Sequence, residues 1–371
     1  IKNTSSRKVA VQIDYVEITA PTFDQWPPES HTRIFFDRPN QKNEGKYARK
    51  VLAQFVHRAW RRPATDAEMD QKMALLARLR PQCADLQEAM VEVLATVLAS
   101  PKFLYLVRAG EADSQGISDH ELASRLSFFL WSSLPDSKLL RLAKQGRLRK
   151  PKVLERQAKR MLADPKAKRL ARHFTRQWLG LELLDFLKID TKAHGRFDPL
   201  LMEAMKEEPV AFFAEVLQRN RSVTDFLQSD YAMVNDRLAR HYKFPELVGS
   251  NLRPVKLQPG DRRGGLLTQA GLLAMNSDGK DSHPLKRGIW LLENILNDPP
   301  PPPPPAVPEI DLADPEILKL TLKQRMEQHR DDPACYSCHA KIDPWGIAFE
   351  NFDATGRWRD LIGKEPVDAT S

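Results

Sequence analysis

The chain has 371 residues, of which 42% are hydrophobic and 29% are charged. This composition is typical of a folded globular protein and excludes an intrinsically disordered chain. No stretch reaches the roughly 18 uninterrupted apolar residues that a membrane-spanning helix needs, so no transmembrane segment is expected. The 57 basic and 49 acidic residues give a net charge of +8, but the two signs are interleaved. We therefore expect no nucleic-acid partner.

Residues 1–45 are expected to be the tail of a preceding β-rich region plus a proline-rich linker. Residues 9–18 alternate between apolar and polar side chains, which indicates a short β-strand at the N-terminus. Residues 20–40 combine prolines with aromatic side chains and indicate irregular structure. Because an isolated strand at a terminus has nothing to pair with, we expect this chain to be an internal fragment of a longer precursor.

From residue 46 onward the spacing of apolar residues is helical, and the sequence predicts a mainly α, multi-helical fold. A small helical domain is expected over 46–108, a central helical domain over 109–260 and a C-terminal domain over 261–371. Capping-box sequences at Thr65–Glu68 and Ser118–Glu121 indicate two helix starts. Helices are predicted at 46–62, 84–107 with an interruption at the proline of "SPKF", 121–134, 134–146, 151–163, 165–187, 198–218, 222–228, 262–275, 282–297 and 314–330.

Seven consecutive prolines, residues 299–305, predict a polyproline II rod of about 20 Å that leads to the last part of the chain. That part contains "DDPACYSCHAKIDPWG" (331–346), in which Cys335 and Cys338 are spaced C-x-x-C and His339 follows directly. The Asp-Pro pair at 343–344 and the glycine at 346 are expected to form a turn.

Three chemistries compete for these side chains. Covalent haem attachment uses two thiols as thioethers and an adjacent histidine as axial iron ligand, which is what C-x-x-C-H provides. A zinc site needs four ligands, and a redox dithiol is expected in a βαβ setting. No second ligand pair follows the motif, and Cys83 is remote. The pattern favours one covalent haem c on Cys335, Cys338 and His339, with zinc and a dithiol as open alternatives.

The sixth iron ligand is not indicated downstream, because residues 340–371 contain neither methionine nor histidine. Upstream, Met275 and His283 are candidates, whereas Met326 and His329 fit better as packed side chains of a helix. Water, or a residue outside this chain, is the alternative. An open position would favour peroxide or small-ligand chemistry over pure electron transfer.

The segment after the motif contains side chains that suit a porphyrin. Trp345 and Phe349 are candidates for the wall of a haem site, and Arg357 and Arg359 are candidates for charge-assisted bonds to its propionates. For each of them, a small aromatic core with surface arginines is the alternative.

These motifs together resemble the large planctomycete-type multi-domain cytochrome c proteins, which consist largely of consecutive domains of unknown function. The resemblance covers about residues 46–371 and is carried by "FVHRAWRRPATDAE", "SPKFLYLVR", "ISDHELASRLSFFLWSSLPD", "GGLLTQAGLLAMNSDGKDSHPLKRGIW" and "HRDDPACYSCHAKIDPWGIAFENFDATGRWR". It implies an exported protein of the periplasm or cell envelope, with the haem role on Cys335, Cys338 and His339. Other haem domains of the same precursor, or a redox partner protein, are the implied partners. It implies no substrate.

Three functions are compatible with this pattern. Electron transfer through one haem is favoured, because no Ser-His-Asp or paired-carboxylate arrangement stands out elsewhere. A peroxidase or oxidase with an open distal site is the first alternative, and whether the chain is an enzyme is left open. A binding or scaffold module with a structural metal at the cysteine motif is the second.

Overall fold

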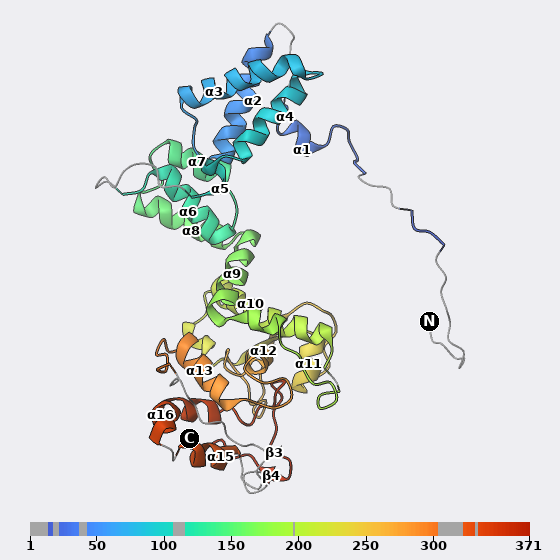
Figure 1. Ribbon diagram of the computed structural model, residues 1–371, viewed down its shortest axis with the longest axis vertical. Coiled ribbons are helices and arrows are strands. Elements are labelled where there is room, and N and C mark those ends of the chain that lie inside the picture. Colours follow the sequence, from blue (N-terminus) through green and yellow to red (C-terminus); the bar gives the residue numbers. More distant parts are fainter. Residues whose placement is uncertain are drawn as a thin grey trace. The chain divides into compact units, whose positions relative to one another are not determined.

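This computed structural model describes residues 14–17, 22–36, 43–106, 116–195, 197–302, 322–330 and 333–371. Within them the chain is mainly helical with a few short antiparallel strands, which confirms the predicted fold class (Figure 1). The chain divides into two compact units, residues 1–125 with 134–149 and residues 126–133 with 150–371. The boundaries of the four segments predicted from the sequence stay predictions.

The first unit is built around three packed helices. Its elements are α1 (Glu29–Thr32), α2 (Glu44–Ala59), α3 (Asp66–Leu79), α4 (Leu86–Leu98), α5 (Pro101–Leu104), the first part of α6 (Asp119–Trp131) and α7 (Ser137–Lys144), with a 3-10 turn at Arg80–Gln82. Leu52, Met69 and Met90 lie in the apolar core that α2, α3 and α4 share. The predicted capping box opens α3: Thr65 Oγ1 accepts from the Glu68 N–H, and the Glu68 carboxylate accepts from the Thr65 N–H.

The second unit combines helices with two short antiparallel strand pairs. Its elements are α8 (Pro151–Leu162), α9 (Lys168–Leu179), α10 (Pro199–Arg219), β1 (Tyr231–Val234), α11 (Asp236–Tyr242), β2 (Arg253–Lys256), α12 (Ala270–Met275), α13 (Pro284–Asn294), α15 (Leu322–Arg330), α16 (Pro333–Ile347), β3 (Leu361–Ile362) and β4 (Glu365–Pro366). In the first pair Tyr231 lies opposite Lys256 and Val234 opposite Arg253. All of β1 is buried, and four buried residues are too few for a recognisable strand pattern.

The helix predicted over 165–187 is divided in the structure. A 3-10 turn at Pro165–Ala167 precedes α9, and another at Leu181–Asp185 follows it. Between α9 and the second turn, Gly180 adopts a left-handed conformation with φ of 68°. Glycine takes this conformation without a Cβ penalty and ends the helix there.

Two further helix predictions were too long. Only α12 is helical within 262–275, because Gly264 and Gly265 have φ of 151° and 71° and lie against neighbouring backbone. A Cβ on Gly265 would lie 2.6 Å from the Leu227 carbonyl oxygen. The segment 222–228 forms only a 3-10 turn, Val223–Phe226.

Helix α16 continues through the Asp343-Pro344 pair, so the predicted turn was wrong. Proline inside a helix removes one backbone hydrogen bond and is ordinarily destabilising. Here α16 packs closely against α13, beside which it lies in Figure 1. A Cβ on Gly288 would lie 2.5 Å from a carbonyl oxygen of α16, and one on Gly346 would overlap a carbonyl oxygen of α13. This close contact between the two helices stabilises the helical course.

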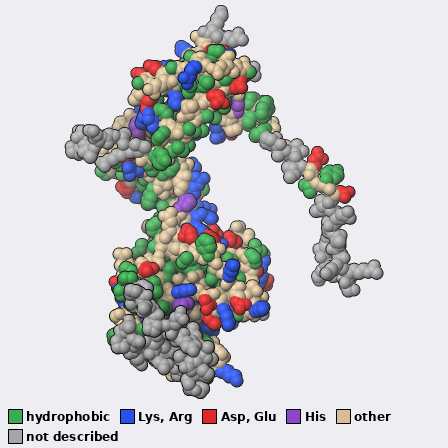
Figure 2. Space-filling model, in the orientation of Figure 1, with side chains coloured by type: hydrophobic (Ala, Val, Ile, Leu, Met, Phe, Trp, Pro, Cys, Tyr) green, Lys and Arg blue, Asp and Glu red, His purple; other side chains and the backbone are tan. Residues whose placement is uncertain are grey.

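Some sequence-based predictions lie partly outside the described residues. Of the strand predicted over 9–18 only residues 14–17 are described, and they are irregular. Of the seven prolines, residues 299–302 are described, and of the helix predicted over 314–330 only α15 is described. On the face drawn in Figure 2, basic and acidic side chains are interspersed over each unit. No described helix has the length and apolar character that crossing a membrane requires.

Candidate functional site

The C-x-x-C-H motif occupies the first turns of α16. Cys335 is buried, and Cys338 and His339 are partly buried. Residues three and four apart on an α-helix lie on the same face, so the three side chains project from one side of α16. The two cysteines are not joined by a disulfide. Two thiols and one imidazole therefore lie together at the start of one helix.

A buried carboxylate contacts the motif histidine. Nδ1 of His339 lies 2.9 Å from Oδ1 of Asp343, one turn further along α16. The Asp343 residue has 0% exposure. Because a carboxylate accepts hydrogen bonds, this contact favours the tautomer with the proton on Nδ1 and makes Nε2 the nitrogen that would bind a metal. The sequence analysis missed this contact because it expected a turn at Asp343. A continuous helix places residues 339 and 343 on one face.

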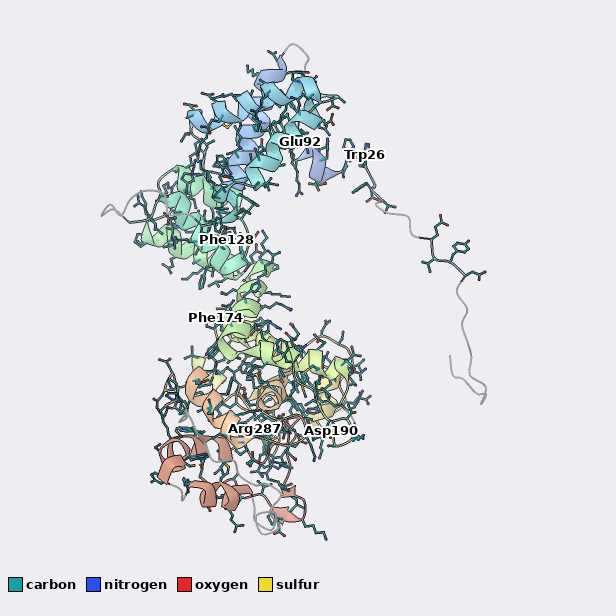
Figure 3. The ribbon with its side chains drawn as sticks, viewed as in Figure 1. Trp26, Glu92, Phe128, Phe174, Asp190 and Arg287 are labelled. Carbon is teal, nitrogen blue, oxygen red and sulfur yellow. The ribbon has the colours of Figure 1, made fainter. Side chains whose placement is uncertain are left out.

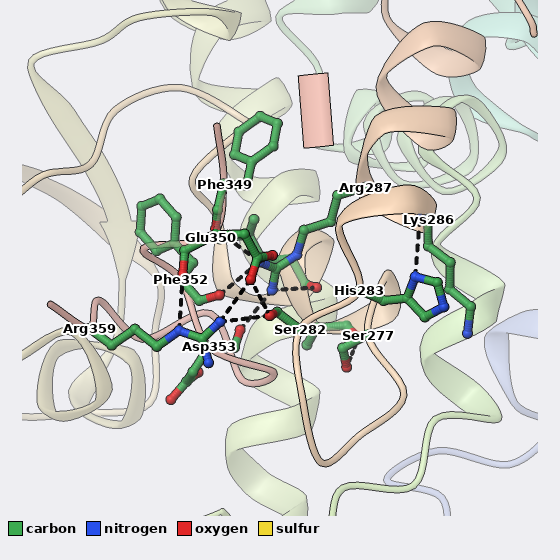
Figure 4. Close-up of polar contacts among 12 residues, drawn as sticks. Ser277, Ser282, His283, Lys286, Arg287, Phe349, Glu350, Phe352, Asp353 and Arg359 are labelled. Atoms are coloured by element: carbon green, nitrogen blue, oxygen red, sulfur yellow. Dashed lines mark hydrogen bonds and ion pairs between the residues drawn. The ribbon is translucent and has the colours of Figure 1, made fainter. Parts of the chain in front are cut away.

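The segment after α16 is fixed by Arg287 of α13, which lies in the interior of the unit (Figure 3). Its guanidinium donates to the carbonyl oxygens of Phe349 at 2.9 Å, Phe352 at 2.7 Å and Asp353 at 2.7 Å. The carboxylate of Glu350 lies 3.6 Å away (Figure 4). Burial lowers the pKa of Arg287 to about 10, and Glu350 opposes that shift, so the guanidinium is charged at neutral pH. One side chain thus ties three backbone carbonyls to α13.

The two arginines predicted to bind propionates have partners within the protein. Arg359 donates to Glu350 Oε2 at 3.0 Å and to Ser282 Oγ at 2.6 Å (Figure 4). Arg357 donates to Nδ1 of His241 at 3.2 Å. Burial, and then the charge of Arg357, lowers the pKa of His241 to about 3, so its ring is neutral and can accept. These bonds hold both arginines in the fold, and a propionate contact stays a prediction.

The remaining predicted site residues lie in different surroundings. Trp345 is 44% exposed, whereas Phe349 packs against the apolar core of its unit. Met275 is buried in that same core. His283 caps α13, where its Nδ1 accepts from the Lys286 N–H at 3.4 Å (Figure 4). Iron ligation by Met275 or His283 stays a prediction.

The same unit contains a second buried polar cluster. The sequence analysis did not predict it, because its members are far apart along the chain. Tyr242 donates to the Glu208 carboxyl at 2.6 Å and accepts from the Ala270 N–H at 2.9 Å. The Arg263 guanidinium lies 3.7 Å from the centre of the Tyr242 ring. Burial raises the pKa of Glu208 to about 8, so this carboxyl is mostly protonated at neutral pH. The cluster joins α10, α11 and α12.

The first unit contains a cavity of about 230 Å³ whose lining includes Arg62, Lys102 and Arg125. Arg62 and Lys102 both bind the carboxylate of Glu68, and Arg125 binds Glu121. These lining charges are therefore paired within the unit. In the part of the chain that the structure describes, no group of three or more His, Cys, Asp or Glu side chains is arranged to hold a metal ion.

Three family models match consecutive parts of the chain. PSD5, described as a protein of unknown function (DUF1595), matches residues 47–107. PSD4, a protein of unknown function (DUF1592), matches residues 117–244. PSCyt3, a protein of unknown function (DUF1588), matches residues 263–361, which include the C-x-x-C-H motif. No curated protein and no solved structure matches the chain.

Proposed function

Because the chain belongs to the planctomycete-type multi-domain cytochrome c proteins, we propose that it carries one covalent haem c and transfers electrons. Cys335 and Cys338 would hold the haem through two thioether bonds, and His339 would ligate its iron. The name PSCyt3, on the match that includes the motif, indicates a cytochrome-type family and agrees with this assignment.

The observation that carries the proposal is the placement of both thiols and the imidazole on one face at the start of α16. The donor set fits haem c, since no disulfide joins the two thiols and the Asp343 contact directs Nε2 towards metal binding. When bound, the haem supplies an iron that changes between two oxidation states. The protein contributes the thioether attachment, the axial nitrogen and a helix whose course is set by its packing on α13.

We further propose that the protein works outside the cytoplasm, in the periplasm or cell envelope. Haem c attachment takes place on the outer side of the bacterial cytoplasmic membrane, so a chain that carries it is exported. Other haem domains of the same precursor or a separate redox protein are the partners that electron transfer requires.

A second candidate function is peroxide chemistry at an open iron position. Two observations favour it. Residues 340–371 contain no methionine or histidine. In addition, His339 contacts a buried carboxylate, which strengthens electron donation from a ligating imidazole.

The test is expression of the whole chain with an export signal and a cytochrome c maturation system. We expect a haem that stays attached in denaturant, with one haem per chain by mass and by the spectrum of its pyridine complex. The double variant Cys335→Ala/Cys338→Ala should lose it, and Cys83→Ala is the matched control that should keep it. Colourless matured protein with both motif thiols titratable, or protein with stoichiometric zinc and no haem, would refute the proposal.

Visible spectra with and without cyanide separate the two candidate functions. A low-spin spectrum that does not respond to cyanide or peroxide supports electron transfer alone. A high-spin spectrum that shifts with either ligand supports the open-site candidate.

A further inference from the structure

We propose that Asp343 is a positioning residue that makes His339 a strongly donating axial ligand and thereby lowers the reduction potential of the haem. This inference rests on the proposed function, because it concerns the iron that His339 would bind. The sequence analysis expected Asp343 only to form part of a turn and gave it no role at the haem.

The first support is the geometry of the contact. His339 and Asp343 are one turn apart on α16, and their Nδ1 and Oδ1 atoms are 2.9 Å apart. The aspartate side chain is 1% exposed and that of the histidine 15%. Glycine contacts with α13 hold the backbone on which both side chains stand. The ring orientation is therefore held by a short contact on a fixed helix.

The second support is the electrostatics of a buried carboxylate. Burial removes the water that would otherwise screen the charge, so the bond from Nδ1–H to the carboxylate is stronger than at the surface. Electron density moves towards Nε2, and an imidazole that donates more strongly stabilises the more positive oxidation state of a bound iron. The expected consequence is a lower potential than a neutral acceptor at Nδ1 would give.

An alternative is that the contact is only an i,i+4 pair that supports the helix. A purely structural pair would change the stability of α16 when removed, but it would not change the potential of the iron. The potential is therefore the readout that separates the two explanations.

The experiment compares haem-loaded, full-length variants by potentiometric titration of the visible spectrum. Asp343→Asn removes the charge and keeps the shape. We expect it to favour the reduced state by about tenfold, which is about 59 mV for a one-electron couple. Asp343→Glu keeps the charge and should stay within about threefold of the wild type. The control is Asp298→Asn, because Asp298 accepts from Lys341 of α16 at 2.7 Å and the change removes one negative charge beside that helix.

Each outcome is decisive. A shift in Asp343→Asn that is absent from both Asp298→Asn and Asp343→Glu supports the inference. Equal potentials in all variants, or equal shifts in Asp343→Asn and Asp343→Glu, overturn it while leaving haem attachment intact. Wild-type protein that binds no haem overturns the proposed function itself. If Asp343→Asn does not accumulate with haem, the comparison of Asp343→Glu with the wild type still decides, because a shift well beyond threefold would contradict a role for the charge.

Discussion

The bundle of α2, α3 and α4 and the pair of α13 and α16 are both helical, but different forces hold them. In the bundle, aliphatic and methionine side chains such as Val51, Leu52 and Met90 fill the shared core. In the α13–α16 pair, two glycines bring backbones into contact, and the buried Arg287 binds the carbonyl oxygens of the segment that follows.

This difference indicates where the molecule tolerates change. An apolar core accepts substitutions that conserve volume, because hydrophobic burial is non-directional. A backbone contact has no room for an added carbon atom, and a buried charge needs every one of its partners. The α13–α16 contacts, which tolerate less change, involve the helix that carries the C-x-x-C-H motif. Substitutions there are expected to destabilise the protein more than substitutions in the bundle of α2, α3 and α4.

The largest effect is expected for Arg287→Met. It removes the Arg287 donor from the carbonyl oxygens of Phe349 and Phe352 and leaves the buried Glu350 with one arginine partner, Arg359, in place of two. The free energy of unfolding should fall by about 3–5 kcal/mol. Amide hydrogen exchange in α13 and α16 measures this loss within the unit.

The control for Arg287→Met is Arg172→Met, which breaks an exposed pair with Glu207. Exposed pairs contribute at most about 1 kcal/mol, so little should change. Similar losses in the two variants would show that the buried arginine is no more important than a surface one.

The next largest expected effect is a change in folding stability with pH, and the group responsible, Glu208, lies in the second unit. The pKa of Glu208 is raised from 4.5 to about 8 by burial. Between these values the unfolded chain releases this proton and the folded chain keeps it, so stability falls as pH rises, by at most about 1.4 kcal/mol per pH unit. Below pH 6.5 the buried neutral ring of His241, whose pKa is lowered from 6.5 to about 3, contributes a slope of opposite sign. Urea unfolding at pH 6.5 to 8 should therefore show the fall in stability, and Glu208→Gln should remove it.

The control for that slope is Glu207→Gln, the neighbouring acid on α10, which leaves Glu208 in place and should keep the slope. A wild-type protein whose stability does not fall over this range would contradict a buried carboxyl that retains its proton.

Two glycine substitutions compare the regions directly. Gly346→Ala would place a Cβ against the α13 backbone and should cost about 1–3 kcal/mol or more, seen as a lower melting temperature. Gly45→Ala in α2 meets nothing within 4 Å and should stabilise the bundle by up to about 1 kcal/mol. If both changes had the same sign, the close helix contact would not be a determinant of stability.

The smallest effect is expected at the start of α3. Thr65→Ala removes the acceptor for the Glu68 N–H and should cost about 1 kcal/mol. The loss should appear as faster amide exchange in the first turn of α3. Thr65→Ser keeps the acceptor and should behave like the wild type, whereas an equal loss in Thr65→Ser would point to the methyl group instead.

The same comparison shows which parts of the fold were predictable. The bundle helices follow from apolar spacing, and Thr65 and Glu68 mark a helix start with residues that interact locally. The break at Gly180 was missed, although a glycine in a left-handed conformation ends the helix. The β1–β2 pair was missed because its strands are four residues long and find each other across 18 intervening residues.

The candidate site also has one part that the sequence predicts and one part that only the structure shows. The residues of a haem attachment motif are adjacent in the chain, so Cys335, Cys338 and His339 could be identified without a structure. The contact of His339 with Asp343 needed the course of α16, and that course depends on α13.

The sequence by itself determined the helical character of this protein and the thiol–imidazole motif, because these depend on residue spacing within a few turns. Only the tertiary structure decided that α16 runs through Pro344, that Asp343 contacts the motif histidine, and that Arg287 binds the segment beyond it. The physical reason is the distance along the chain between the residues that interact. Propensities and caps act between near neighbours, whereas buried charges and glycine contacts depend on partners that only folding brings together.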